Sequence, residues 1–456
     1  MDDRLGNKVL KSGDRVKQEI ETHKFLYTVG VRFPYGPLFI ELKTLKNMTS
    51  NFIFWAIIAF ICFDLVGDII LTALNVSWSK KPIPEILKDV YNKEEYEKQQ
   101  AYSSEVRKVD VLKMFVSYAI VILFFSLGGY GWLDAIIGSL TSSFVLKALI
   151  YYIFIDAIAS FTNIFVDDYE TFSIEERYGF NNSTVGLFFG DWLKNSMISL
   201  ILGGGMFMLY AWFYVLTPQW FWLLCFAVTS VVSVLFSYFY SNIIVPLFNE
   251  QTPLEDGELR NAIETFAKKV NFQIENIYVL DESKRTTKAN AYFTGFGKRK
   301  RIVLYDTLIK QLNTDEIVAV LAHEIGHYKG GHTIKDILMS LSKDFIKFFL
   351  IYLLIDSDII SIAGGAVSAS FCVNWILIPF LLIPISFITS WIENIISRRF
   401  ERYADKFAKD NGCGSSLASG LKKISAQALS NLTPHPIVVN FEYSHPTLEE
   451  RVKNML

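Results

Sequence analysis

The sequence contains little cysteine and almost no excess of charge of either sign. Its four cysteines include no CxxC pair, and we expect them to be small buried or lipid-facing thiols. A formal net charge of -2 over 456 residues offers no basic field to nucleic acid, which excludes that class of partner. No secretory signal peptide is visible, because the first strongly apolar run follows about fifty mostly polar residues. We therefore expect membrane insertion to depend on spans within the chain.

Apolar residues are abundant. Hydrophobic side chains make up 51% of the chain and aromatic ones 15%, with a mean hydropathy of +0.30. That balance is too apolar for a soluble enzyme unless much of the surface faces lipid, so we predict a mainly helical polytopic membrane protein. Seven stretches approach the roughly twenty residues that a helix needs to cross a bilayer. They are residues 51–74, 112–130, 144–166, 195–216, 221–245, 345–365 and 373–396.

The loops between these spans alternate in basic content. Lys and Arg are absent from 131–143, 217–220 and 366–372, but present in 75–111, 167–194, 246–344 and the tail after 397. By the positive-inside rule the second group is cytoplasmic. The expected organisation is a polar extension (1–50), five spans with cytoplasmic loops (51–245), a cytoplasmic insertion (246–344), two more spans (345–396) and a cytoplasmic C-terminal segment (397–456).

The N-terminal extension disagrees with this topology. Five spans before a cytoplasmic insertion put residues 1–50 outside, yet these residues are rich in Lys and Arg. The basic residues are Arg4, Lys8, Lys11, Arg15, Lys17, Lys24, Arg32, Lys43 and Lys46. Either the extension is translocated against the rule, or the first span is not a full crossing, or native translation starts at Met48. N-terminal sequencing of the natural protein tests the third alternative.

Residues 250–344 have the pattern of a soluble α/β unit. The stretch 258–269 has helical spacing, 274–280 has the composition of a strand, and 290–294 with 301–305 form the arms of a predicted β-hairpin. A strand beside a zinc-binding helix can pair with an extended peptide by adding it to the sheet edge. The insertion therefore contains the elements of a peptide-binding site.

A capped helix follows the hairpin. Asn313 is a capping residue and Glu316 stands three positions later, which is a capping-box signal. This helix carries a His-Glu-x-x-His motif at His323, Glu324 and His327. Residues four apart lie on one helical face, so the two imidazoles can bind one metal ion while Glu324 faces the water that the metal holds. The motif predicts a zinc hydrolase.

A hydrolytic zinc site needs a third protein ligand and an open fourth position. The close pattern His-x-x-Gly-x-x-His is excluded, because Thr333 stands where the histidine belongs and His332 is out of phase by one. A distant carboxylate is the other solution. Glu401 can supply it, and Asp405, four residues later on the same helical face, can accept the second N–H of a ligating histidine.

The residues by themselves leave alternatives open. Glu401 and Asp405 can equally pair along a surface helix with their basic neighbours Arg398, Arg402 and Lys406. His435, which stands between two prolines, is most simply a loop residue. His445 can donate a hydrogen bond to a tetrahedral oxyanion, but spacing alone does not assign it that role.

The motifs taken together resemble those of a known family. They are Gly179-Phe180-Asn181 with Thr184, Pro246-Leu247-Phe248-Asn249, Thr252-Pro253-Leu254-Glu255-Asp256-Gly257-Glu258-Leu259, Asn290-Ala291-Tyr292, Arg301-Ile302-Val303-Leu304-Tyr305-Asp306-Thr307-Leu308, the His-Glu-x-x-His motif, Glu401-x-x-x-Asp405 and Ser444-His445-Pro446. From about residue 82 to the end, this set is similar to the integral-membrane CAAX prenyl proteases, which are zinc enzymes with seven membrane helices.

The resemblance implies one zinc ion and a set of site residues. The implied metal ligands are His323, His327 and Glu401, the implied catalytic residues are Glu324, His445 and Asp405, and the implied substrate-binding residues are Asn290 and Ala291. Glu324 is the general base, Asp405 supports a ligand, and His445 steadies the transition state. The seven helices of this family enclose a chamber with the zinc site on its cytoplasmic side.

The implied reaction removes the last three residues from proteins that end in a prenylated Cys-a-a-X sequence. The implied partners are prenylated substrates and a lipid bilayer, in the endoplasmic reticulum of a eukaryote or the inner membrane of a bacterium. One alternative is a broad-specificity membrane quality-control zinc protease, and another is a channel or scaffold with a vestigial metal helix. Cleavage of matched prenylated and unprenylated peptides tests the first alternative, and metal analysis tests the second.

Overall fold

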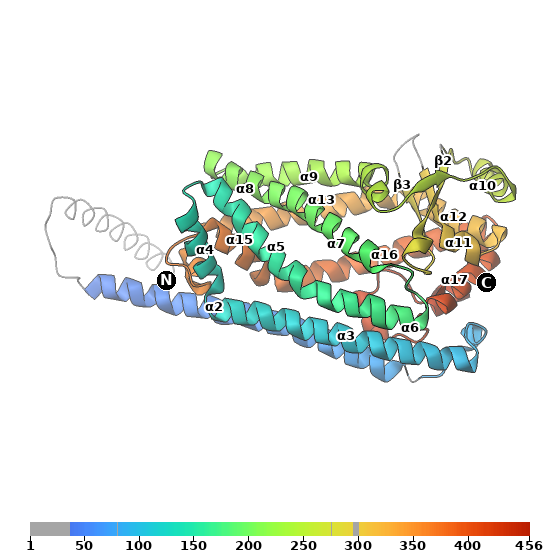
Figure 1. The fold of residues 1–456 in the computed structure, drawn as a ribbon, viewed down its shortest axis with the longest axis horizontal. Coiled ribbons are helices and arrows are strands. Elements are labelled where there is room, and N and C mark those ends of the chain that lie inside the picture. The colour runs from blue at the N-terminus through green and yellow to red at the C-terminus, as the bar shows by residue number, and fades with distance from the viewer. Residues whose placement is uncertain (1–36, 80, 275, 295–300) are drawn as a thin grey trace, which may run out of the picture. The chain divides into compact units, whose positions relative to one another are not determined.

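The computed structural model describes residues 37–79, 81–274, 276–294 and 301–456, and within them the protein is mainly helical (Figure 1). The chain up to Ile53 and the chain from Phe54 to Leu456 are separate compact units. Every predicted site residue belongs to the second unit. Most of the basic N-terminal extension lies outside the described residues, and the three alternatives for it stay predictions.

Five helical segments of the described chain are long and apolar enough to cross a membrane. The first is the Met48–Trp78 part of α2 (Pro37–Trp78), and the second is α3 (Lys93–Ser126). The others are α5 (Phe144–Tyr169) continued by η2 (Glu170–Glu175) and α6 (Glu176–Tyr178), α7 (Val185–Ile198) continued by η3 (Ser199–Gly204) and α8 (Gly205–Leu216), and α9 (Phe221–Phe239) continued by η4 (Tyr240–Ile244) and η5 (Val245–Leu247). Helices α15 (Phe371–Leu381) and α16 (Ile383–Asp410) make a sixth if this pair, bent by 54°, is one span. Proline inside α15 and in the first turn of α16 explains the bend.

The predicted span over 345–365 differs from the structure in its limits. That stretch is divided between α13 (His332–Leu354) and α14 (Asp358–Ala363). Helix α13 packs against α9 (Figure 1), but three charged residues, Lys343, Asp344 and Lys347, lie in the run that leads to its apolar end. It is therefore not among the segments that qualify as spans by composition. The count of seven spans and the enclosed chamber stay predictions.

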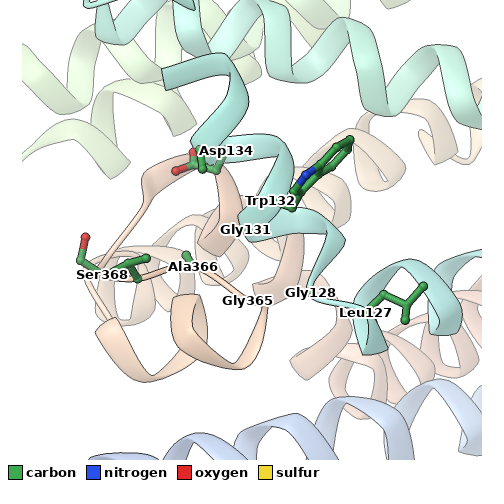
Figure 2. Close-up of a pocket in the computed structure, with 10 residues that line it drawn as sticks. Leu127, Gly128, Gly131, Trp132, Asp134, Gly365, Ala366 and Ser368 are labelled. Carbon is green, nitrogen blue, oxygen red and sulfur yellow. The ribbon is translucent and has the colours of Figure 1, made fainter. Parts of the chain in front are cut away.

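The predicted loop over 131–143 is largely the helix α4 (Gly129–Leu140). The first turn of α4 touches the segment after α14, where the Gly131 backbone N–H donates to the Gly364 carbonyl at 2.8 Å. A Cβ atom on Gly131 would lie 2.1 Å from the Gly365 backbone, so this approach requires glycine. A cavity of about 480 Å³ opens beside the junction, lined on one side by Trp132 and on the other by Ser368 (Figure 2). None of the predicted site residues lines it.

A four-stranded sheet forms the β part of the insertion. Its order is β1 (Gln251–Pro253), β2 (Asn276–Leu280), β4 (Arg301–Tyr305) and β3 (Ala291–Thr294). Strand β4 runs parallel to β2 and antiparallel to β3, which confirms the predicted hairpin. The turn of the hairpin lies outside the described residues. Because β3 is the last strand of the sheet, one of its edges has no partner strand in the described part of the chain.

Short helices surround the sheet and precede the motif helix. The predicted helix over 258–269 is confirmed as α10 (Glu258–Lys269), and η6 (Glu282–Lys284) and α11 (Asp306–Gln311) follow. Helix α12 (Thr314–Lys329) begins with the predicted capping box, in which Asn313 Oδ1 accepts from the Glu316 N–H and Glu316 Oε2 accepts from the Asn313 N–H. Two orphan N–H groups are thereby satisfied. The sequence alone therefore specifies where the motif helix starts.

The hydrophobic core of the insertion lies beneath α12 and extends to the C-terminal helices. Ile317, Leu321 and Ile325 of α12 are each at most 2% exposed, and the half-buried Val320 packs against the same core. The core also receives apolar side chains from η1 (Glu85–Leu87), α17 (Gly414–Gln427) and α19 (Leu448–Met455). Each fully buried Ile or Leu side chain contributes roughly 1.5–3 kcal/mol. Segments far apart in the sequence are thereby fixed around one helix.

Candidate metal centre

Three donor groups from two helices converge on one point. His323 and His327 of α12 and Glu401 of α16 each offer a ligand atom, and these atoms all lie within 4.8 Å of one another. The two Nε2 atoms are 3.1 Å apart, and the Glu401 oxygens lie 3.4 Å from His323 Nε2 and 3.2 Å from His327 Nε2. The structure thus brings together the two neighbouring histidines and the distant carboxylate.

This donor set fits a divalent metal ion. Metal–nitrogen and metal–oxygen bonds of about 2.0–2.1 Å in tetrahedral geometry separate neighbouring ligand atoms by about 3.3 Å, which matches the separations above. One oxygen of Glu401, Oε2, is buried and accepts no hydrogen bond in the described structure, although His323 Nε2 lies 3.4 Å and Arg451 Nη2 lies 3.6 Å from it. A buried carboxylate oxygen without a hydrogen bond is costly, and a metal ion at this point removes that cost.

Close packing of the two helices makes the convergence possible. Gly326 lies between the two motif histidines in the sequence of α12, and a Cβ atom there would approach Ala404 Cα of α16 to 2.8 Å. The backbone of α16 can therefore lie against α12 only because residue 326 is glycine. Glu401 and Asp405, on the facing side of α16, are 4% and 3% exposed.

Asp405 holds the first histidine. His323 Nδ1 lies 2.8 Å from Asp405 Oδ1, so Nδ1–H donates to the carboxylate and Nε2 is left facing the centre. Arg451 of α19 donates to both Asp405 oxygens, at 2.9 and 2.7 Å. Burial alone lowers the pKa of His323, but hydrogen bonds to Asp405 and Glu401 outweigh it and raise the pKa to about 9. A metal ion bound at Nε2 must therefore displace a proton.

His332 holds the second histidine in the same way. Its Nδ1 atom lies 3.0 Å from His327 Nδ1, and its ring stacks on Phe400 with the centroids 4.1 Å apart. Burial lowers the pKa of His332 to about 4, so its neutral Nδ1 can accept the His327 Nδ1–H. Sequence spacing correctly excludes His332 from the close zinc pattern, but it gives no sign of this supporting contact, because the partner is Nδ1 of a ligand and the packing surface is on α16.

Glu324 adjoins the first ligand on α12 and is partly buried. Burial raises the pKa of its carboxyl above the usual value, although the imidazoles of His323 and His327 act in the opposite sense. A raised pKa suits a carboxylate that has to accept and return a proton near neutral pH.

His445 approaches the centre from the C-terminal segment. Its Nε2 atom lies 3.3 Å from Glu401 Oε1, and its Nδ1 atom lies 2.9 Å from the Ser444 hydroxyl. If the hydroxyl donates to Nδ1, the ring carries its proton on Nε2, which then faces the centre as a donor. The side chain is 59% exposed, so the Nε2–H remains accessible from solvent.

The alternative in which Glu401 and Asp405 pair with basic neighbours along a surface helix is wrong. Both carboxylates are buried against α12, while the exposed cations of α16 have other partners. Arg402 pairs with Glu450 at 2.6 Å and Lys406 pairs with Asp410 at 2.6 Å. His435 is not part of the centre, because it caps α18 (Pro436–Glu442) by accepting from the Ile437 N–H.

Asn290 and Ala291 lie at the open edge of the sheet. Ala291 begins β3 opposite Leu304 of β4, and the exposed Asn290 side chain accepts from the Ala291 N–H at 2.8 Å. Their role in holding a substrate stays a prediction.

Comparison with known proteins assigns the family. Residues 72–250 match the family model described as "CAAX prenyl protease N-terminal, five membrane helices", and residues 253–456 match the model of peptidase family M48. The "CAAX prenyl protease 1 homolog" of Arabidopsis thaliana is 33% identical over 405 residues, which cover 84% of this chain and 91% of the relative. This chain belongs to the CAAX prenyl protease family of M48 peptidases. It is therefore a multi-pass membrane metalloprotease.

Other proteins of the family match this chain over a similar share of its length. "CAAX prenyl protease 1" of Saccharomyces cerevisiae is 30% identical over 400 residues, which cover 82% of this chain and 88% of the relative. The crystal structure of S. mikatae Ste24p superposes with a TM-score of 0.81 at 29% identity, and the match covers 89% of this chain and 99% of that one. The CAAX prenyl protease resemblance and the mainly helical membrane fold predicted from the sequence are thus confirmed.

Proposed function

We propose that the chain is a zinc endopeptidase that removes the C-terminal tripeptide from prenylated Cys-a-a-X proteins. The observation that supports this most strongly is the convergence of His323, His327 and Glu401 on one point, where one buried Glu401 oxygen accepts no hydrogen bond in the described structure. Two imidazoles, one carboxylate and an open fourth position are the donor set of catalytic zinc, so we propose one Zn²⁺ per chain. When bound there, zinc lowers the pKa of a water molecule and polarises the scissile carbonyl.

The proposed chemistry uses four side chains. Glu324 takes a proton from the attacking water and passes it to the leaving amine. The Nε2–H of His445 donates to the oxygen on which negative charge develops. Asp405 accepts the Nδ1–H of His323, and His332 accepts the Nδ1–H of His327. Both Nε2 atoms therefore stay directed at the centre.

The edge of the sheet can bind the substrate backbone. Strand β3 is the edge strand, and an extended peptide can add to it through main-chain hydrogen bonds. We propose that Asn290 and Ala291, at the start of β3, hold the peptide in this manner. The Asn290 carboxamide already contacts the Ala291 N–H, so it can exchange that bond for one to the substrate.

The substrate class and the location follow from the family. The relatives in Arabidopsis and yeast bear the name CAAX prenyl protease 1, and this chain has apolar helices that suit a lipidated substrate held near a bilayer. We propose a multi-pass protein of the endoplasmic reticulum membrane if the cell is eukaryotic, or of the inner membrane if it is bacterial. The loops that contain Lys and Arg support the proposal that the zinc site faces the cytoplasm.

A matched pair of peptides tests the proposal. The full chain in proteoliposomes is given one Cys-a-a-X peptide with a prenylated cysteine and the same peptide without the lipid, and Glu324→Gln serves as the inactive control. We expect release of the tripeptide from the prenylated peptide alone, and none from the Glu324→Gln variant. Equal cleavage of both peptides and of misfolded membrane proteins would instead indicate a broad-specificity quality-control protease.

A further inference from the structure

The short helix α18 ends without a backbone cap of its own. Its last residues are Val439 to Glu442, and the backbone of Tyr443, the residue after the helix, is extended. The last four carbonyls of a helix have no partner within the helix, so they need donors from elsewhere. The chain then continues directly through Tyr443 and Ser444 to His445. The position of the C-terminal end of α18 therefore determines the position of the His445 backbone.

Two side chains of α16 supply the missing donors. Arg398 donates from Nη1 to the Val439 carbonyl at 2.9 Å and from Nη2 to the Asn440 carbonyl at 3.1 Å. Asn394, one turn earlier on α16, donates to the Phe441 carbonyl at 2.7 Å. Three of the last four carbonyls of α18 are thus bound by one face of α16.

Arg398 also reaches past the helix end. Its Nη1 atom donates to the Tyr443 carbonyl at 2.5 Å, which fixes the first residue of the segment that carries His445. Arg398 is 6% exposed, and the hydrogen bonds of its guanidinium in the described structure all go to oxygens of Val439, Asn440 and Tyr443. Its positive charge is therefore balanced by backbone carbonyls, which is the favourable arrangement for a cation at a helix C-terminus.

The same helix face bears the metal ligand. Arg398 and Glu401 are three residues apart on α16, so their side chains project from neighbouring positions on one side of the helix. One rigid element thus fixes both the carboxylate in the centre and the backbone that leads to His445. Helix α16 carries Glu401 and, through Arg398, holds the backbone before His445. It therefore fixes both partners of the 3.3 Å contact between His445 Nε2 and Glu401 Oε1.

We infer that Arg398, assisted by Asn394, is a positioning residue that holds His445 at the reacting carbonyl by binding the C-terminal carbonyls of α18. This inference rests on the proposed function, in which His445 donates to the oxyanion. The hydrogen bonds of Arg398 in the described structure go to the end of α18 and to Tyr443, and none goes to His323, His327 or Glu401. Removal of Arg398 is therefore expected to impair the transition-state step without releasing the metal.

A double-mutant cycle tests the inference on the full chain. Arg398→Met keeps an unbranched side chain but removes every donor, and it is measured with His445→Ala, with the double variant and with the control Arg402→Met. Arg402 lies on the same helix, and its exposed side chain pairs with Glu450. Tripeptide release from the prenylated peptide gives kcat and KM, and metal analysis with the visible spectrum of the cobalt-substituted protein reports on the centre.

We expect Arg398→Met to lower kcat by roughly 10- to 100-fold, since a displacement of about 1 Å at a reacting centre can cost that much. KM, metal content and the cobalt spectrum stay as in the wild type, and Arg402→Met resembles the wild type. In the His445→Ala background the same substitution changes kcat by less than about threefold, because the imidazole that Arg398 positions is already absent. Arg398→Lys, which keeps the charge and some donors, recovers part of the loss.

Three results would overturn the inference. One is an unchanged kcat in Arg398→Met while His445→Ala is impaired, and another is an equal loss in both backgrounds, which indicates a structural role only. The third is a harmless His445→Ala substitution, which would remove the proposed oxyanion role, and the positioning role with it. If Arg398→Met does not fold, Asn394→Leu takes its place in the cycle, with a smaller loss of kcat expected in the wild-type background and none in the His445→Ala background.

Discussion

Helices α12 and α16 contribute to the metal centre in different ways. In α12 the proposed ligands and base lie within five consecutive positions, the helix starts at its own capping box, and its buried residues recur at helical spacing. In α16 the functional side chains are Asn394, Arg398, Glu401 and Asp405, and each of them has its partner on another segment. The role of α12 can therefore be inferred from a short sequence motif, whereas the role of α16 becomes apparent only from its contacts in the folded chain.

The difference shows what each helix adds to catalysis. In the proposed mechanism α12 carries the groups that touch metal and water, and α16 supplies the carboxylate and holds the surrounding segments at fixed distances from it. Substitution of the base Glu324 on α12 should therefore remove chemistry and leave the metal centre assembled, while substitution of the supporting residues on α16 should alter the centre. The following substitutions test that contrast.

The largest effect is expected from Glu324→Ala in α12. Removal of the general base should lower kcat by at least about 10²- to 10⁴-fold, because proton transfer is lost from both halves of the reaction. Metal content should not change, since Glu324 is not among the converging donors. Asp315→Asn, an exposed change on the same helix, is the control and should retain full activity. Loss of metal from Glu324→Ala would contradict the division of roles.

Asp405→Asn in α16 should weaken metal binding. An amide cannot stabilise the His323 Nδ1–H as a carboxylate does, and it leaves Arg451 without its partner, so zinc affinity should fall by about 10- to 100-fold. Competition with a chromophoric chelator measures the dissociation constant. Asp410→Asn, whose exposed carboxylate on the same helix pairs with Lys406, should bind zinc as the wild type does. Equal affinity in the two variants would refute the supporting role of Asp405.

Glu316 connects α12 to α17 and should make stability depend on pH. Burial raises the pKa of Glu316, but Lys423, Ser419 and the Asn313 N–H donate to its carboxylate and hold the pKa below its usual value. A carboxyl with a lowered pKa in the folded state stabilises the protein above its unfolded pKa of about 4.3. That contribution is lost as the pH falls through the folded-state pKa. Glu316→Gln should therefore lower the free energy of unfolding by about 2 kcal/mol at pH 7.

Thermal unfolding in detergent at several pH values measures the effect of Glu316→Gln. The difference between wild type and variant should shrink below about pH 4. Glu264→Gln is the matched control, because Glu264 pairs with Arg260 on the surface, where such pairs contribute about 0–1 kcal/mol. A difference that stays constant from pH 7 to pH 3 would show that the charge of Glu316 is not its source.

The smallest effect is expected from the cap of α12. Asn313→Ala should cost about 1 kcal/mol, because it removes one side-chain acceptor from the first turn. Asn313→Ser restores an acceptor and should recover most of the loss. A loss of metal together with this small destabilisation would indicate that the start of α12, and not its packing against α16, fixes the ligands.

The sequence specifies most of this site but not its supports. The His-Glu-x-x-His motif, the capping box and the hairpin are local patterns, and local patterns predict local structure. Glu401 and Asp405 can be found because they are four apart, although spacing alone left a surface helix equally open. His332, Arg451 and Arg398 could not be assigned, because each acts through a contact between segments remote in sequence. The predicted span over 345–365 also missed the limits of α13. That helix continues through the charged residues before position 345, of which Lys343 pairs with Glu393 on α16.

The central claim is that one metal centre is shared between α12 and α16, and metal analysis of three purified proteins tests it directly. The wild type, Glu324→Ala and Glu401→Ala are expressed and purified side by side, and zinc per chain is measured. We predict about one zinc ion per chain in the wild type and in Glu324→Ala, and almost none in Glu401→Ala, because two imidazoles on one helix hold zinc weakly without the third ligand. Full zinc content in Glu401→Ala would contradict the shared centre.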